Sequence, residues 1–195
     1  IVPGLQQPSP ADVMRGEETQ IAGALALLPD FGGVLCLPGT HSKWAHISAG
    51  EVVSFQTYMT GELFALLSQQ SVLRHGMAGD GWDAVAFDQG VSDAFSRPEK
   101  IAACLFTLRA EGLLAGLSAD AARARLSGLL IGSELAAAKP YWLGQRVVLI
   151  GAERLSASYA RALSSQGLSS DMLDATACTL SGLATARGIL RKAAP

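Results

Sequence analysis

The residues of this chain that are best suited to chemistry lie in one short turn, Pro38-Gly39-Thr40-His41-Ser42-Lys43. Strand-like runs flank it, Val34-Leu35-Cys36 before and Ala45-His46-Ile47 after. A tight turn of this kind offers backbone N–H groups, two hydroxyls and an ammonium group to an anion, and phosphate is the obvious candidate. The alternative is an ordinary Pro-Gly hairpin whose polar residues face water. Taken alone, the turn leaves both interpretations open.

Other chemistries fit this turn less well. A P-loop requires a second Gly before the Lys and a helix after it, whereas a strand-like run follows Lys43. Ser42 and His41 do not suit a nucleophile and its base, because adjacent residues on an extended chain point to opposite faces and no G-x-S-x-G elbow is present. The histidines His41, His46 and His75 lack the spacing of a zincin-type site. A hydrolase or a metal-hydrolase function is therefore weakly supported.

A second group of polar residues lies at residues 14–20, at the start of a predicted helix. Two carboxylates, Glu17 and Glu18, stand there beside Arg15. A carboxylate in this place could position and deprotonate a substrate hydroxyl, and Arg15 could hold a substrate carboxylate. The competing explanation is that acidic residues in the first turn only stabilise the helix through its dipole.

A third signal is the pair Gly151-Ala152, which follows the apolar run at residues 146–150. Small residues between a buried strand and a helix allow a flat ligand such as adenine to approach the backbone. The same residues would also permit close packing of the helix on the sheet. The sequence leaves both explanations open.

The elements that must position these residues indicate an α/β layered domain. A helix is predicted from Gly16 to Leu28, and three strands at residues 34–37, 43–47 and 52–59 are predicted to form an antiparallel meander. Residues 146–151 indicate a buried strand followed by a helical pattern. A last helix is expected at about residues 176–191.

The middle of the chain is predicted to be mostly helical. Thr60 is expected to cap one helix, Pro98 to open a second, and Ser118 to cap a third that runs towards Leu135. Residues 74–96 are rich in Gly and Asp, and we expect them to contain a loop that could move.

Composition narrows the function classes. The chain of 195 residues is 49% hydrophobic with a net charge of −2, which argues against general disorder and against a nucleic-acid partner. No apolar run has the length of a membrane span, so a soluble cytoplasmic protein is the expectation. Cys36, Cys104 and Cys178 lie far apart without a C-x-x-C pair, and we expect buried thiols rather than a disulfide framework or a zinc site.

Taken together, several stretches of the chain resemble the 2-keto-3-deoxygalactonate kinase family, also called 2-dehydro-3-deoxygalactonokinases. They are VMRGEETQ (residues 13–20), LPGTHSKW (37–44), YMTGELFALL (58–67) and LSGLLIG (126–132). The first three motifs are long and occur in the family's order, and the resemblance covers nearly the whole chain.

The resemblance implies a fold and a reaction. The fold is that of the actin, hexokinase and heat-shock-protein superfamily, in which ATP lies between two ribonuclease H-like halves. The reaction is the phosphorylation of the C6 hydroxyl of 2-dehydro-3-deoxy-D-galactonate by ATP with Mg²⁺, a step of D-galactonate catabolism.

The resemblance also implies roles for single residues. The second phosphate hairpin would comprise Gly39, Thr40, His41, Ser42 and Lys43, and the adenosine-side turn would comprise Gly151 and Ala152. By analogy with related sugar kinases, Glu18 is the first candidate for the catalytic base and Glu17 the second. Arg15 or Lys43 would bind the carboxylate of the sugar acid. No metal ligand is assigned within the chain, and a homodimer is left open.

One part of the family pattern has no counterpart here, the Asp-containing first phosphate hairpin near the N-terminus. The chain is therefore expected to be the C-terminal two thirds of a family member. Residues 1–30 would end the first half, with the connecting helix, and residues 31–195 would form the second half. That second half would hold the meander at 34–59, a helical insertion at 60–139 and the nucleotide-side strand and helices at 146–195.

The missing hairpin also sets an alternative function. If nothing precedes Ile1, we expect no kinase activity, because one wall of the ATP cleft is missing. The chain would then be a non-catalytic or truncated actin-like nucleotide-binding module.

Overall fold

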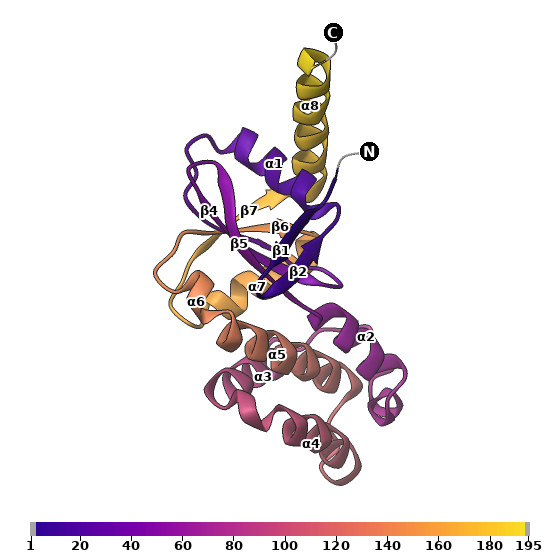
Figure 1. The fold of residues 1–195 in the computed structure, drawn as a ribbon. Helices are drawn as coiled ribbons and strands as arrows, with labels where there is room; N and C mark the ends of the chain where they lie inside the picture. The colour runs from indigo at the N-terminus through magenta and orange to yellow at the C-terminus, as the bar shows by residue number, and fades with distance from the viewer. Residues whose placement is uncertain (1–2, 194–195) are drawn as a thin grey trace. The chain divides into compact units, whose positions relative to one another are not determined.

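The structure is a computed structural model that describes residues 3–193 (Figure 1). The described chain divides into two compact units. A sheet unit holds residues 3–58, 141–160 and 169–193, and a helical unit holds residues 59–140 and 161–168. No helix within residues 3–193 has both the length and the apolar character needed to cross a membrane.

The sheet unit is built on a five-stranded mixed sheet with the strand order β5-β4-β3-β6-β7. The predicted meander is confirmed as β3 (Gly33–Leu37), β4 (Ser42–Ser48) and β5 (Glu51–Tyr58), each antiparallel to the next. The predicted buried strand is β6 (Val147–Gly151), which runs parallel to β3. Parallel to it lies β7 (Ser170–Asp174), a mostly exposed edge strand that the sequence did not indicate, because its two Asp residues and a Ser mask a strand pattern.

Two helices of the sheet unit pack closely, α1 (Glu17–Leu27) and α8 (Ala175–Ala193). A Cβ at Gly23 would collide with the backbone of Cys178, and one at Gly182 would collide with the backbone of Thr19. Glycine on both helices therefore allows this close approach. The unit also contains residues 153–160 of α7 (Glu153–Ser164), and the short helix α6 (Lys139–Trp142) lies where the chain returns to it.

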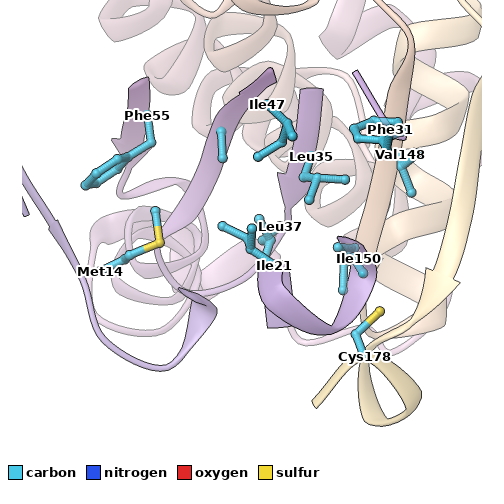
Figure 2. Close-up of a cluster of buried hydrophobic side chains, with 12 residues drawn as sticks. Met14, Ile21, Phe31, Leu35, Leu37, Ile47, Phe55, Val148, Ile150 and Cys178 are labelled. Carbon is cyan, nitrogen blue, oxygen red and sulfur yellow. The ribbon is translucent and has the colours of Figure 1, made fainter. Parts of the chain in front are cut away.

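The core of the sheet unit follows the strand alternation (Figure 2). Leu35 and Leu37 of β3 and Ile47 of β4 lie in one cluster with Ile21 of α1 and Cys178 of α8. Residues at every second position of a strand share a face, so the face of β4 that carries Ile47 packs towards α1 and α8. Burial of Cys36 and Cys178 is confirmed, whereas Cys104 is only half-buried, and all three thiols are free.

An N-terminal hairpin, β1 (Leu5–Pro8) with β2 (Ala11–Met14), was not predicted because its strands are short and polar. Its side chains bind the outer edge of β5. Gln7 accepts a hydrogen bond from the N–H of Phe55 at 3.1 Å, and Asp12 accepts one from the N–H of Thr57 at 2.7 Å. The hairpin thus satisfies edge N–H groups that could otherwise pair with another chain.

The helical unit comprises α2 (Thr60–Gln69), η1 (Val72–Gly76), α3 (Ala84–Ser96), η2 (Pro98–Lys100), α4 (Ile101–Leu114) and α5 (Ala119–Ala137). Two predicted helix starts are confirmed. Pro98 opens the short helix η2 before α4, and the Ser118 hydroxyl accepts a hydrogen bond from the N–H of Ala121 at the start of α5. Arg125 of α5 joins three helices by binding Glu111 of α4 at 2.5 Å and Asp93 of α3 at 3.4 Å.

One prediction for this unit is wrong in detail. Thr60 does not cap α2, since it is the first helical residue and Met59 precedes it without a side-chain cap. The loop expected within residues 74–96 is present at residues 77–83, and it ends where Asp83 caps α3 by accepting a hydrogen bond from the N–H of Ala86 at 2.9 Å. Helix α3 then buries an apolar stripe that the Gly and Asp residues had masked: Phe87, Val91 and Ala94.

Candidate functional site

The predicted nucleotide-side residues meet at one end of the sheet. Because β3 and β6 are parallel neighbours, Pro38, which follows β3, and Gly151, the last residue of β6, lie at the same edge of the sheet. A pocket of about 340 Å³ opens there, which we call the turn pocket. Its lining includes Glu17, Gln20, the turn residues 38–41, Gly151, Ala152 and Ala175.

Gly151 is required for the close approach of the two turns. A Cβ at this position would lie 3.0 Å from the carbonyl oxygen of Pro38 and 3.1 Å from the hydroxyl of Ser156. The packing explanation for this glycine is therefore correct, and the same contact leaves Gly151 lining the turn pocket beside Gly39. Close packing and access for a ligand are compatible here.

A second pocket, of about 770 Å³, lies between the N-terminal hairpin and the start of α1, and we call it the hairpin pocket. Arg15, Lys43 and residues of both hairpin strands line it. Glu17 and His41 line both pockets, so these two residues mark the place where the pockets meet. No sequence signal predicted the hairpin's contribution, because the hairpin itself was not predicted.

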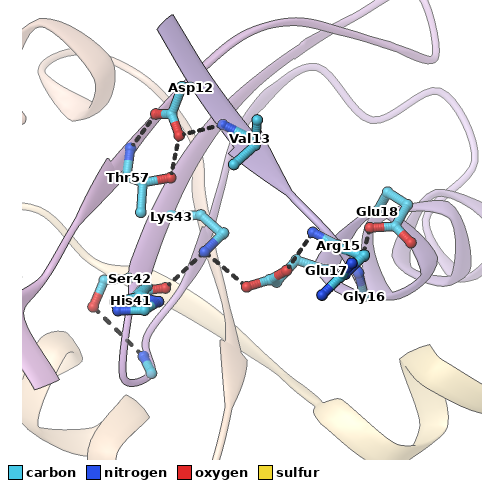
Figure 3. Close-up of polar contacts among 11 residues, drawn as sticks. Asp12, Val13, Arg15, Gly16, Glu17, Glu18, His41, Ser42, Lys43 and Thr57 are labelled. Atoms are coloured by element: carbon cyan, nitrogen blue, oxygen red, sulfur yellow. Dashed lines mark hydrogen bonds and ion pairs between the residues drawn. The ribbon is translucent and has the colours of Figure 1, made fainter. Parts of the chain in front are cut away.

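Lys43 is buried and organises this junction (Figure 3). Its Nζ donates to Glu17 Oε1 at 2.8 Å and to the carbonyl oxygen of His41 at 3.1 Å, and only 4% of the side chain is exposed. Lys43 lines the hairpin pocket but not the turn pocket. Its ammonium group therefore serves first to hold the two residues that the pockets share.

The surroundings of Glu17 keep it charged. Burial alone would raise the pKa of Glu17, but the hydrogen bond and positive charge of Lys43, together with backbone N–H groups of Glu17 and Arg15, outweigh burial and hold this pKa below its ordinary value. Glu17 is therefore a carboxylate at neutral pH and can accept a hydrogen bond from a ligand.

Glu18 has a different environment although it is adjacent. Its Oε2 accepts a hydrogen bond from the N–H of Gly16 at 2.6 Å, and its Oε1 lies 3.4 Å from the hydroxyl of Thr19. Glu18 lines neither the turn pocket nor the hairpin pocket. The helix-start explanation thus applies to Glu18, while Glu17 is the carboxylate that faces the pockets.

Within the phosphate turn the structure separates exposed from buried residues. Thr40 and His41 are exposed and line the turn pocket. Ser42 is fully buried, its hydroxyl lies 2.8 Å from the hydroxyl of Tyr159, and it lines neither pocket. A phosphate-binding Ser42 stays a prediction, and the burial of its side chain disfavours both that role and a nucleophilic one.

Arg15 is one of the residues that line the hairpin pocket. It is exposed, and its guanidinium group has no hydrogen bond or ion pair with any residue of the described chain. A cation without an internal partner is available to an anionic ligand.

Metal ligands are a separate question. Between residues 3 and 193, no three His, Cys, Asp or Glu side chains are grouped so that they could hold a metal ion. Glu17, the acidic side chain shared by both pockets, is already paired with Lys43.

Comparison with known proteins gives consistent results. Residues 1–186 match the family model described as 2-keto-3-deoxy-galactonokinase. The chain is 42% identical over 192 residues to a probable 2-dehydro-3-deoxygalactonokinase of Rhizobium meliloti (strain 1021), covering 95% of this chain and 63% of the relative. It is 37% identical over 170 residues to the 2-dehydro-3-deoxygalactonokinase of Escherichia coli (strain K12), covering 86% of this chain and 57% of that protein.

Solved structures agree with these relatives. A Sinorhizobium meliloti protein assigned as a 2-dehydro-3-deoxygalactonokinase superposes with a TM-score of 0.90 at 42% identity, over 96% of this chain and 64% of that one. Component A of the Acidaminococcus fermentans (R)-2-hydroxyglutaryl-CoA dehydratase superposes with a TM-score of 0.50 at 16% identity, over 87% of this chain and 64% of that one, which shows a shared fold only.

The chain thus spans less than two thirds of the length of each of these proteins. The family match nevertheless includes every residue of the turn pocket and the hairpin pocket. The chain belongs to the 2-keto-3-deoxy-galactonokinase family.

Proposed function

We propose that the protein containing this chain is a kinase that transfers the γ-phosphoryl group of ATP to the C6 hydroxyl of 2-dehydro-3-deoxy-D-galactonate. Family membership and the names of the relatives support the substrate class. The observation that carries the proposal for this chain is that Glu17 and His41 line both the turn pocket and the hairpin pocket. A donor in one pocket and an acceptor in the other would meet beside these residues.

The turn pocket is the proposed nucleotide side. Gly39, Thr40 and His41 would face the phosphates, and Gly151 with Ala152 would face the adenosine. Thr40 suits this role because it makes no hydrogen bond to another residue of the described chain, which leaves its hydroxyl and N–H for a ligand. Backbone N–H groups in such a turn are suitable donors to phosphate oxygens.

The hairpin pocket is the proposed acceptor side. Arg15 would bind the carboxylate of the sugar acid, a group for which its planar guanidinium is well suited. Glu17 would accept a hydrogen bond from the C6 hydroxyl and take its proton during transfer. Phosphoryl transfer depends mainly on positioning and charge stabilisation, so a carboxylate with a lowered pKa is adequate for orienting this hydroxyl.

This assignment reverses the order in which the sequence ranked the two carboxylates. Glu17 becomes the proposed catalytic residue, and Glu18 is left with the start of α1. Lys43 would act by holding Glu17 rather than by binding phosphate. We assign no Mg²⁺ ligand among the described residues, and the phosphates of ATP would supply ligands to the ion.

The wider context belongs to the same proposal. The five-stranded unit would be the C-terminal ribonuclease H-like half of an actin-like kinase, with the helical unit as its insertion. Residues 1–30 would end the first half, and the enzyme would act in the cytoplasm in galactonate catabolism. The similarity of fold to the dehydratase component supports this architecture.

A pair of matched variants tests the proposal. In full-length protein, a coupled assay with ATP and 2-dehydro-3-deoxygalactonate should show turnover. Glu17→Gln should lower kcat about 10²- to 10⁴-fold, the range expected for loss of a general base. Glu18→Gln, the same change one residue away, should alter kcat less than about threefold, because Gln can still accept the bond from Gly16.

Each failure has a distinct meaning. Equal loss of kcat in both variants would contradict the assignment of Glu17. If the protein phosphorylated a different sugar acid and not 2-dehydro-3-deoxygalactonate, the substrate assignment would be wrong. If it bound ATP but transferred no phosphoryl group, the alternative of a non-catalytic nucleotide-binding module would be favoured.

A further inference from the structure

Strand β4 begins with two consecutive polar residues that are both buried, Ser42 and Lys43. Successive side chains of a strand point to opposite faces of the sheet. Lys43 reaches Glu17 on the α1 face, and Ser42 reaches Tyr159 of α7 on the other. The phosphate turn is therefore fixed at its C-terminal end from both faces.

Tyr159 lies on α7, the helix that follows the turn at Gly151 and Ala152. Helix α7 begins at Glu153, directly after Gly151 and Ala152, and only 1% of Tyr159 is exposed. Its hydroxyl lies 2.8 Å from Ser42 Oγ, which also lies 3.5 Å from the N–H of Gly39. A series of contacts thus runs from Tyr159 of α7 through Ser42 to Gly39 of the phosphate turn.

We propose that Tyr159 is a positioning residue of the turn pocket, which holds Gly39, Thr40 and His41 through Ser42. This inference rests on the proposed function only for the identity of the ligand, the phosphates of a nucleotide. The positioning itself is a property of the free protein.

The physical reason is the cost of burying hydroxyls. A buried hydroxyl without a hydrogen-bond partner is costly, so Ser42 and Tyr159 stabilise the arrangement in which they meet. The turn residues Thr40 and His41 are exposed, and packing against them does little to fix their conformation. Without the Tyr159 hydroxyl, Ser42 Oγ would keep only the long contact with Gly39 among the residues that the structure describes, and a turn with more conformations would bind an anion less tightly.

Hydrogen exchange on the full-length protein tests the positioning without reference to activity. Tyr159→Phe removes one hydroxyl and keeps the ring. We expect amide exchange at Gly39, whose N–H contacts Ser42 Oγ, to become about five- to tenfold faster, the factor that corresponds to one net hydrogen bond. Tyr141→Phe is the matched control, because the Tyr141 hydroxyl has no hydrogen-bond partner within residues 3–193, and it should leave this exchange unchanged.

Kinetics give a second readout that a loss of folded protein would not reproduce. Tyr159→Phe should raise the KM for ATP about tenfold and change the KM for the sugar acid much less, because Ser42 contacts Gly39, which lines the turn pocket and not the hairpin pocket. Ser42→Ala should have a similar effect, and the double variant should be no worse than either single one. Ser48→Ala, at the exposed end of the same strand, is the control for the serine change.

The two proposals fail in different ways. Unchanged exchange at Gly39 in Tyr159→Phe, or effects of the two single variants that simply add, would overturn the positioning role. Absence of ATP turnover in the wild-type protein would overturn the proposed function, and the exchange experiment would still decide the role of Tyr159.

Discussion

The start of β4, at Ser42 and Lys43, and the crossing of α3 with α5 are both closely packed, but different groups hold them together. At β4 the contacts come from buried polar side chains, Ser42 to Tyr159 and Lys43 to Glu17. At the helix crossing they come from backbone. A Cβ at Gly128 of α5 would lie well inside van der Waals distance of a carbonyl oxygen of α3, and the same is true of Gly90 and Gly132 with their facing backbones.

The difference separates stability from positioning. Glycine contacts allow helices to approach but orient no side chain, so they contribute packing energy alone. Hydrogen bonds of buried side chains have direction, and at β4 they fix a short exposed turn and a carboxylate between two pockets. A site built on residues locked by buried neighbours has the rigidity that binding and catalysis require.

The largest effect is expected at the helix crossing. Gly128→Ala should lower the free energy of unfolding by about 3 kcal/mol, because the added methyl group meets the backbone of Phe87 and the helices must separate. Gly112→Ala is the matched control, since nothing lies within 4 Å of a Cβ there, and it should raise stability by about 0.5–1 kcal/mol. Chemical denaturation followed by circular dichroism measures both. If Gly128→Ala and Gly112→Ala changed the free energy of unfolding equally, the close approach of α3 and α5 would not depend on glycine.

A smaller loss is expected from the polar contacts. Lys43→Met should destabilise the protein by about 2 kcal/mol, because the half-buried carboxylate of Glu17 loses the cation that pairs with it. Adding Glu17→Gln to Lys43→Met should recover part of this loss, since an amide does not require a cation. Lys100→Met, at an exposed lysine, should change stability by less than about 0.5 kcal/mol. Strict additivity of the Lys43 and Glu17 changes would contradict the contact.

The pH dependence of stability gives a second test of the ion pair between Lys43 and Glu17. The pKa of Glu17 in the folded protein lies below its ordinary value of 4.5, so the stability that its charge contributes is fully present above pH 4.5. This contribution is lost as the pH falls through the lowered folded value. Wild type should therefore exceed Glu17→Gln in stability by about 1 kcal/mol at neutral pH, and the difference should shrink below pH 4.5.

Denaturation curves at several pH values between 7 and 3 would measure this difference. Glu99→Gln, at an exposed carboxylate of η2, controls for the removal of one acidic group. A difference that grows as the solution becomes more acidic would contradict the sign.

The smallest effects concern the thiols. Cys104 of the helical unit is half-buried, whereas Cys36 and Cys178 of the sheet unit are buried. Burial, with the negative charge of Asp174, also raises the pKa of the Cys178 thiol. Labelling of the native protein with a thiol reagent should therefore modify Cys104 first. Earlier modification of Cys178, identified by mass spectrometry, would show that the contact of α1 with α8 opens more readily than the helical unit.

Local sequence patterns predicted most of the elements that support the site. The meander at residues 33–58, the buried strand at 147–151 and the helix after Gly16 have strong apolar patterns, and all are present. The hairpin at residues 5–14, β7 and α3 were missed. Their strands are polar or their apolar stripe is interrupted by Gly and Asp, and contacts distant in sequence, such as Asp12 with Thr57, stabilise them.

The sequence by itself determined the motifs, the family and the candidate residues, because these depend only on residue type and order. Tertiary structure decided which candidates face a ligand. The adjacent pairs Glu17 with Glu18 and Ser42 with Lys43 look equivalent in the sequence, yet in each pair the side chains point to different surroundings. The physical reason is that helix and strand geometry rotate neighbouring side chains apart, and only the packed neighbours decide whether each meets a pocket, a helix end or a buried partner.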